Sequence, residues 1–374
     1  MADANAAAIL VKISLMLDYQ SNPRRHENIT AVCLLSGLAA ILIARVYATP
    51  YFLGDERFWN TGARLWSEGA LLYANGIPGD NKLPGIFYIH RLSNWLFAPT
   101  PYFARLIAAA LQLGGALAVY GITRRFMPAL ERLWCLAAYV AVISTSSTDV
   151  GNGGTTEAFL HPFCALAFFI YGSGGGLRSA ALAGLSMGVA ICFKQSAALP
   201  LAALMCWPLL ERRGLKEPAA MLASAAAVCA LALLPILIQG TTVPQLCDAL
   251  RPIRFLMPSR SALPLFDWYV WLEWLPSFAL ILYVLIPRRE AWPFLIWLAA
   301  DVIAVNVPGK YFSHQFKQMV PSFAMCSGMA MAVVLRGRPP QEQFSILARL
   351  VALFFIFTAA ITYFAFRPVR AFWL

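Results

Sequence analysis

Charged residues are scarce in this chain of 374 residues. They make up 13% of it, against about 25% in an ordinary soluble domain. Hydrophobic residues reach 60%, and apolar runs of about 20 residues, long enough for a helix to cross a bilayer, recur from end to end. The composition argues against several soluble domains. It predicts an all-α fold, a polytopic transmembrane bundle of about eleven spans.

Cysteine pairs are also missing, and the N-terminal residues do not form a clear signal peptide. The eight cysteines are scattered, with no C-x-x-C pair, so neither a disulfide framework nor a zinc site is indicated. No basic region precedes the apolar stretch 6–17, which favours a short surface helix over a signal peptide. Basic runs with interleaved aromatics do not occur outside the apolar segments. The net charge of +11 therefore indicates membrane topology and contact with anionic lipid, and no nucleic acid is expected as a partner.

Basic residues set the predicted orientation. They cluster at alternate helix ends, and the positive-inside rule makes that side cytoplasmic. Residues 1–28 are then cytoplasmic or interfacial, and residues 51–101 form the first extracytoplasmic loop. We expect residues 1–374 to be one domain with no soluble C-terminal domain. The predicted spans are 29–50, 102–123, 131–148, 157–172, 177–193, 196–210, 218–239, 268–286, 291–307, 316–335 and 344–366.

The first extracytoplasmic loop contains two predicted interfacial helices. In residues 56–69, Phe58, Leu65 and Trp66 share one helical face, while Asn60 and Arg64 lie on the other. Residues 86–97 form the second, with aromatic residues suited to the headgroup zone. Cations in the outer loops break the positive-inside bias, and binding of an anionic group such as a lipid phosphate would explain them.

Asp55 and Glu56 follow the first span directly. A carboxylate at the lipid–water boundary is costly, and one of them could act as a general base on an acceptor hydroxyl or amine. The alternative is a pair that caps the helix that follows. Composition alone does not separate the two interpretations.

Four further stretches place polar residues at predicted outer helix ends. Each has a structural alternative: Lys82 and Lys194 as snorkelling lysines, Glu157 as a helix cap, and His314 as a hydrogen-bonded structural residue. The functional interpretation is that the lysines pair with a phosphate and the acids orient substrate or hold a cation. The candidates in these stretches are Lys82 in the turn 73–85, Asp149 and Glu157 around a Gly- and Thr-rich turn, Lys194 and Gln195 between two apolar runs, and Lys310, Tyr311 and His314 before a span. Arg254, in the predicted outer loop 240–267, is a further candidate.

Together these stretches resemble the polytopic C-type glycosyltransferases that use polyprenyl-phosphate sugars, a group that includes the protein O-mannosyltransferases and the lipid A aminoarabinose transferase. The resemblance covers residues 29–335 and lies in the order of the motifs. They are Gly54-Asp55-Glu56, a Tyr…Asp-Asn-Lys-x-Pro-Gly turn (Tyr73, Asp80 to Gly85), Thr156-Glu157, Phe193-Lys194-Gln195 and Tyr-Phe-x-His-x-Phe-x-Gln-x-x-Pro (Tyr311 to Pro321).

The resemblance implies a role for each motif. Asp55 would be the catalytic base, and the acceptor would attack the anomeric carbon with inversion as the polyprenyl phosphate leaves. Lys82, Lys194 and an arginine such as Arg254 would stabilise the anionic leaving group, and Tyr311 and His314 would line the donor pocket. Leu83 stands where the family often has a second proline, which puts the geometry of that turn in doubt. Members of the family differ in whether they need a divalent cation, and no dedicated metal motif is present.

The sequence thus predicts a bacterial inner-membrane enzyme with its active site on the periplasmic side. Its partners would be a polyprenyl-phosphate sugar donor, a glycolipid or glycan acceptor, and the lipid bilayer. A transporter or lipid flippase is the main alternative, and it predicts ionisable residues along a path through the bilayer. An acyltransferase would require a histidine cluster, and a scaffold would leave the outer charges unexplained.

Overall fold

The computed structural model describes residues 23–47, 52, 54–74, 82–97, 99–145, 154–250, 275–306, 313–343, 345–350 and 352. The helices are α2 (Pro23–Tyr47), α3 (Gly54–Ser67), α4 (Gly85–Leu96), α5 (Tyr102–Thr123), α6 (Ala129–Thr145), α8 (Thr156–Gly174), α9 (Gly176–Phe193), α10 (Ala198–Leu210), α11 (Lys216–Ile238), α12 (Val243–Ala249), α14 (Leu275–Leu285), α15 (Trp292–Asn306) and α16 (Val320–Leu335). Three short 3-10 turns are η1 (Gln195–Ala197), η3 (Arg289–Ala291) and η4 (Ser313–Met319). The described part of the chain contains no strand.

Ten of the predicted spans coincide with helices of this bundle. The predicted and observed ends agree within a few residues, except for the span 268–286, of which only α14 is described. The predicted span 344–366 lies almost wholly outside the described residues. Within the described residues, five helices are long and apolar enough to cross a membrane (Arg24–Tyr47, Tyr102–Thr123, Gly176–Phe193, Lys216–Ile238 and Gln315–Leu335). The all-α membrane bundle is therefore confirmed as a fold, and the number of spans stays a prediction.

Small residues let the helices approach closely. Gly184 and Gly188 are four apart on α9 and face α11, where a Cβ on Gly184 would lie 2.3 Å from the carbonyl oxygen of Met221. This is the spacing with which membrane helices pack backbone to backbone. Outside these contacts the helices expose leucines and isoleucines, as expected of surfaces that face lipid.

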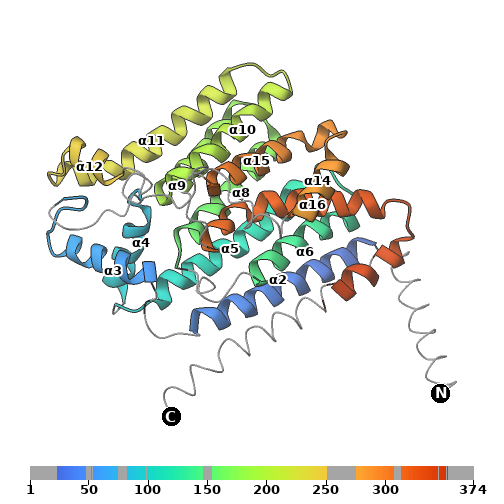
Figure 1. Cartoon of the computed structure of the whole chain (residues 1–374), viewed down its shortest axis with the longest axis horizontal. Helices are drawn as coiled ribbons and strands as arrows, with labels where there is room; N and C mark the ends of the chain where they lie inside the picture. Colours follow the sequence, from blue (N-terminus) through green and yellow to red (C-terminus); the bar gives the residue numbers. More distant parts are fainter. Residues whose placement is uncertain are drawn as a thin grey trace, which may run out of the picture.

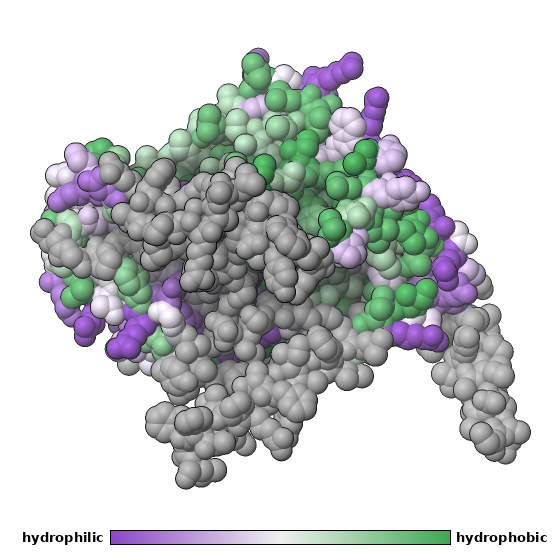
Figure 2. Space-filling model, in the orientation of Figure 1, coloured by the Kyte–Doolittle hydropathy of each residue, from purple (hydrophilic) through white to green (hydrophobic). Residues whose placement is uncertain are grey.

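Polar side chains gather at the two ends of the bundle. Figure 2 shows hydrophilic groups at the left end and along the right margin, with hydrophobic surface between them. The end at the right of Figure 1 carries ion pairs between predicted cytoplasmic residues, such as Arg132 with Glu27 at 3.3 Å and Arg336 with Glu131 at 3.3 Å. The predicted separation of the two groups of charges is thus present in the fold.

The first loop forms the two predicted helices, α3 and α4, which pack together at the left of Figure 1. One detail differs from the expectation. Asn60, predicted on the polar face, is buried together with Trp59 and Trp66. Arg57 and Arg64, predicted on the same face, are exposed, so the departure is confined to Asn60.

Candidate functional site

The end of α2 and the starts of α3 and α5 lie at the left of Figure 1. Arg45, near the end of α2, donates to the carbonyl oxygens of Ile143 (2.8 Å) and Ser144 (2.5 Å) at the end of α6. These carbonyls belong to the last turn of a helix, where backbone acceptors lack an intrahelical partner. Arg45 therefore ties two predicted outer helix ends together and brings a buried cation to this end of the bundle.

Glu56 and Arg105 form a bidentate ion pair between α3 and α5. Arg105 donates from Nε to Oε1 at 2.9 Å and from Nη2 to Oε2 at 2.6 Å, and both side chains are buried. Gly154 lies directly against this carboxylate, because a Cβ there would be 1.8 Å from Oε1 of Glu56. The pair holds the start of α3 against the start of α5, with the segment before α8 covering it.

Glu157 and Lys194 form a second buried pair. Nζ of Lys194 donates to Oε1 of Glu157 at 2.5 Å, and the side chains are 7% and 1% exposed. Glu157 lies in the first turn of α8, and Lys194 follows the last residue of α9. The two residues are 37 positions apart in the sequence. Two stretches whose candidates were predicted separately therefore meet in one contact. The backbone of Gln195 continues from Lys194 into η1.

The lysine turn of the first loop packs against the same place. A Cβ on Gly85, the first residue of α4, would lie 2.7 Å from the carbonyl oxygen of Cys192, two residues before Lys194. The hydroxyl of Tyr73 donates to the carbonyl oxygen of Lys82 at 2.7 Å, and burial raises the pKa of that tyrosine well above its usual value of 10. The turn that contains Lys82 is therefore fixed next to the end of α9.

Lys317 adds another buried cation from η4. It is 3% exposed and lies within electrostatic range of Arg45, Glu56 and Glu157. Among the described residues, the buried basic side chains at this end outnumber the acidic ones. The basic side chains are Arg45, Arg105, Lys194 and Lys317, and the acidic ones are Glu56 and Glu157. Asp301 of α15 is also buried and accepts a hydrogen bond from Ser322 of α16. A desolvated site with excess positive charge favours an anionic ligand.

Asp55 differs from Glu56 in its exposure and in its contacts. It lies exposed in the first turn of α3, and it forms no hydrogen bond or ion pair with any residue that the structure describes. Glu56, one position on, turns inward to Arg105. Of the two adjacent carboxylates, Glu56 thus has a structural partner and Asp55 is available to a substrate.

Five candidates fall at least partly outside the described residues. Asp149, Arg254, Lys310 and Tyr311 are not described, and nothing is described of the His314 side chain, although its backbone belongs to η4. In the described part, no group of three or more histidine, cysteine, aspartate or glutamate side chains could hold a metal ion.

Sequence reasoning missed Arg45, Arg105 and Lys317. Arg45 and Arg105 lie inside predicted apolar spans, and an arginine there is itself a signal of an internal partner or a function. Lys317 lies within the motif from Tyr311 to Pro321, in which only Tyr311 and His314 were named as candidates. All three could have been found by treating each cation within an apolar run as a candidate.

The interface between α3 and α4 contains a histidine without partners. His90 is 1% exposed and neither ring nitrogen has a hydrogen-bond partner. Its ring centroid lies 6.4 Å from that of Trp59. Burial, together with the positive charge of Arg105, lowers the pKa of His90 from 6.5 to about 3. His90 is therefore neutral at physiological pH.

Comparison with known proteins finds the fold but no sequence relative. No protein-family model and no curated protein sequence matches the chain. Among solved structures, ArnT from Cupriavidus metallidurans bound to undecaprenyl phosphate is similar, with a TM-score of 0.59 and 17% identity over 80% of this chain and 60% of that one. The arabinosyltransferase EmbB from Mycobacterium smegmatis matches with a TM-score of 0.57 and 15% identity over 82% of this chain and 30% of that one.

An archaeal enzyme extends the likeness. The oligosaccharyltransferase AglB from Archaeoglobus fulgidus, in complex with an inhibitory peptide and a dolichol-phosphate, has a TM-score of 0.58 and 13% identity over 88% of this chain and 54% of that one. The chain therefore spans less than two thirds of the length of each of these proteins. At such identities the likeness shows the fold, and this is the fold of the polytopic C-type glycosyltransferases, which the order of the motifs predicted.

Proposed function

We propose that the chain is an inverting membrane glycosyltransferase that moves a sugar from a polyprenyl-phosphate donor to a glycolipid or glycan acceptor. The observation that carries this proposal is the pairing of two features at one end of the bundle. An exposed, unengaged carboxylate, Asp55, stands next to a buried cluster with more cations than carboxylates. The similar proteins bound to undecaprenyl phosphate and dolichol-phosphate support a lipid phosphate as the anion.

In the proposed reaction Asp55 accepts the proton of the acceptor hydroxyl or amine. The acceptor atom then attacks the anomeric carbon from the face opposite the phosphate, and the bond between that carbon and the phosphate oxygen breaks. The polyprenyl phosphate leaves with an additional negative charge, so that cations placed beside it stabilise the transition state more than the ground state. Lys194, Lys82 and Lys317 are the described cations that we assign to this role, together with Arg254 from the outer loop.

The reaction takes place on the periplasmic side in this proposal. The candidate residues all belong to predicted extracytoplasmic helix ends, and the basic residues that set the orientation lie at the opposite end. A bacterial inner membrane, where polyprenyl-phosphate sugars face the periplasm, would supply the donor. Glu157, Gln195, Lys310, Tyr311 and His314 would complete the walls of the donor site, and Asp149 would face them from the outer turn.

Deletion of the gene tests the proposal directly. One sugar mass is expected to disappear from the surface glycolipids or polysaccharide, and the wild-type gene should restore it. The measurement is mass spectrometry of the extracted glycolipids and polysaccharide. An unchanged glycan profile would contradict the proposal and favour a transporter or flippase.

Lys194→Ala is expected to raise the KM for the donor about ten-fold or more while the KM for the acceptor changes little, because a charge-assisted contact with phosphate is lost. Steady-state kinetics with each substrate varied in turn gives the two constants. Glu157→Gln is the matched comparison, since it removes the carboxylate partner of Lys194 and leaves the ammonium group in place. Because glutamine keeps the size of this wall residue and leaves the ammonium group of Lys194 in place, the donor KM of Glu157→Gln should rise far less than that of Lys194→Ala. An equal rise in both variants would mean that the pair acts only as a structural tie.

A further inference from the structure

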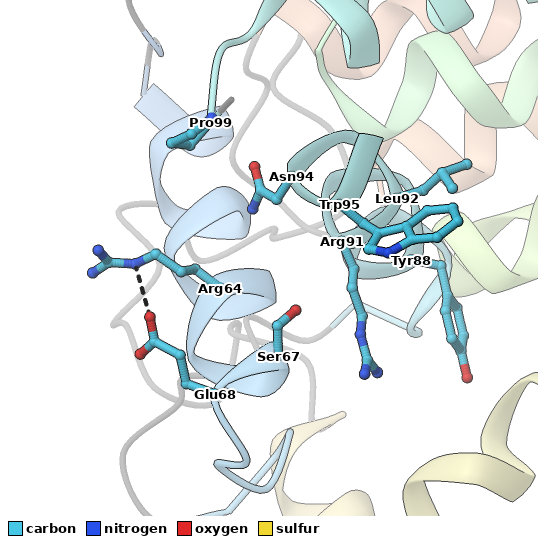
Figure 3. Close-up of a pocket in the computed structure, with 9 residues that line it drawn as sticks. All are labelled: Arg64, Ser67, Glu68, Tyr88, Arg91, Leu92, Asn94, Trp95 and Pro99. Atoms are coloured by element: carbon cyan, nitrogen blue, oxygen red, sulfur yellow. Dashed lines mark ion pairs between the residues drawn. The ribbon is translucent and has the colours of Figure 1, made fainter. Parts of the chain in front are cut away.

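A second site lies between the two helices of the first loop. A cavity of about 770 Å³ opens between α3 and α4. Figure 3 shows that Ser67 of α3 and Asn94 of α4 project into the space between the helices, while Arg64 and Glu68 lie on the outer side of α3. The remaining lining residues are Tyr88, Arg91, Leu92, Trp95 and Pro99.

Buried polar atoms at this interface lack hydrogen-bond partners. Both amide atoms of Asn94 are unpaired, and so are the hydroxyl of Ser93 and the ring nitrogens of His90 on the same helix. On α3 the same holds for the indole nitrogen of Trp59 and the side-chain oxygen of Asn60. His90 and Ser93 are each 1% exposed. Of these side chains only Asn94 lines the cavity. Since a buried unpaired polar group is costly, its two unpaired amide atoms indicate a place for a polar ligand.

The side chains of the cavity favour a carbohydrate. Asn94 can donate and accept hydrogen bonds at once, which suits sugar hydroxyls. Trp95 is 79% exposed, so that its ring is available to the apolar face of a sugar. Tyr88 also lines the cavity, where its ring packs against Trp66 and its hydroxyl donates to the carbonyl oxygen of Ala232 at 2.9 Å. A saccharide ring has apolar faces and edges that carry hydroxyl groups. A flat apolar surface next to hydrogen-bond donors and acceptors can contact both.

One cation in the cavity has no acidic partner. The guanidinium of Arg91 lies 4.4 Å from the ring centroid of Trp66, which holds it in place, and it forms no ion pair with a described carboxylate. A stacked guanidinium keeps its edge free for a carboxylate or phosphate. Arg64, by contrast, is loosely paired with Glu68 at 3.9 Å, with both side chains more than half exposed. The ligand is therefore expected to carry a negative charge near Arg91.

The cavity is too far from Asp55 to hold the reacting hydroxyl. The lining residues of α3, Arg64 and Ser67, follow Asp55 by 9 and 12 positions, which corresponds to roughly 14–18 Å along a helix. We propose that this cavity binds an anionic saccharide unit of the acceptor, remote from the group that receives the new sugar. This inference rests on the proposed function, because it assumes an acceptor that extends along α3.

Photo-crosslinking in the native membrane tests the inference. Leu92→p-benzoylphenylalanine places the crosslinker in the cavity at a side chain that has no assigned polar contact. The full-length protein is irradiated in cells and purified, and the adduct is analysed by mass spectrometry. The expected adduct contains a saccharide with a phosphate or carboxylate group. Adducts of phospholipid alone, adducts of neutral sugar, or no adduct would overturn the proposal.

Three variants sharpen the test. Arg91→Gln combined with Asn94→Leu should lower the adduct yield about ten-fold or more, because charged hydrogen bonds are lost. Arg64→Gln, the same charge change at the exposed rim, should have little effect. Asn94→Leu alone should leave thermal stability unchanged or raise it, since it removes unpaired buried atoms. An adduct that persists in the double variant would overturn the proposal.

The crosslink is separable from catalysis. In Asp55→Asn the adduct should form as in the unsubstituted cavity, because this change leaves the α3–α4 interface intact. If the anionic saccharide is captured but deletion of the gene alters no glycan, the transferase function fails, and the cavity is a site for an anionic saccharide that is not an acceptor. If a sugar mass disappears on deletion but no charged saccharide is captured, the transferase function stands and the cavity inference fails.

Discussion

Asp55→Asn is expected to fold normally and to lose glycosyl transfer by about 10²–10⁴-fold, the range that a general base contributes. The asparagine side chain keeps the size of the aspartate and can still accept a hydrogen bond at the start of α3. It cannot accept the acceptor's proton. Because Asp55 is exposed and makes no contact with described residues, the fold has no interaction to lose.

The measurement compares strains that express each variant at equal level in the deletion background. The sugar mass that the wild type restores should be absent or strongly reduced with Asp55→Asn. Glu342→Gln provides the matched control, since Glu342 is an exposed carboxylate at the opposite end of the bundle, 3.6 Å from Arg338. It should restore the glycan fully. Equal restoration by Asp55→Asn would remove the aspartate from the mechanism.

The helices of the bundle could be predicted because their signal is local. A run of apolar residues long enough to span the bilayer is read from the segment itself, and α5 begins and ends where residues 102–123 were expected. The order of the outer motifs also placed Glu56, Glu157 and Lys194 at one end of the bundle. These predictions needed only the length of each span and the fact that successive helices end on opposite sides of the membrane.

Which side chains pair could not be predicted in this way. Lys194 and Glu157 were predicted as separate substrate contacts, and the pair forms because α8 and α9 are antiparallel neighbours, an arrangement that neither motif encodes alone. Likewise, the adjacent carboxylates of Asp55 and Glu56 look equivalent in sequence. Their roles separate only because Arg105 of α5 reaches one of them.

Arg105→Met is expected to cost about 3–5 kcal/mol of stability, the usual penalty for leaving one member of a buried ion pair without its partner. The carboxylate of Glu56 would stay buried against Gly154, with no guanidinium to balance it. The change also removes the contact between Nη1 of Arg105 and the carbonyl oxygen of Val46, at 3.4 Å. Thermal unfolding of the purified protein in detergent measures the loss.

The exposed pair of Arg64 and Glu68 provides the control, because Arg64→Met removes the same charge from a pair in water and should cost at most about 1 kcal/mol. Combining Arg105→Met with Glu56→Leu should recover most of the stability, since replacing both charges by apolar groups is often neutral. If Arg105→Met melts like the wild type, the pair does not anchor α3. If the double variant stays as unstable as the single one, the loss comes from packing around Arg105, and the charge of Glu56 is not its cause.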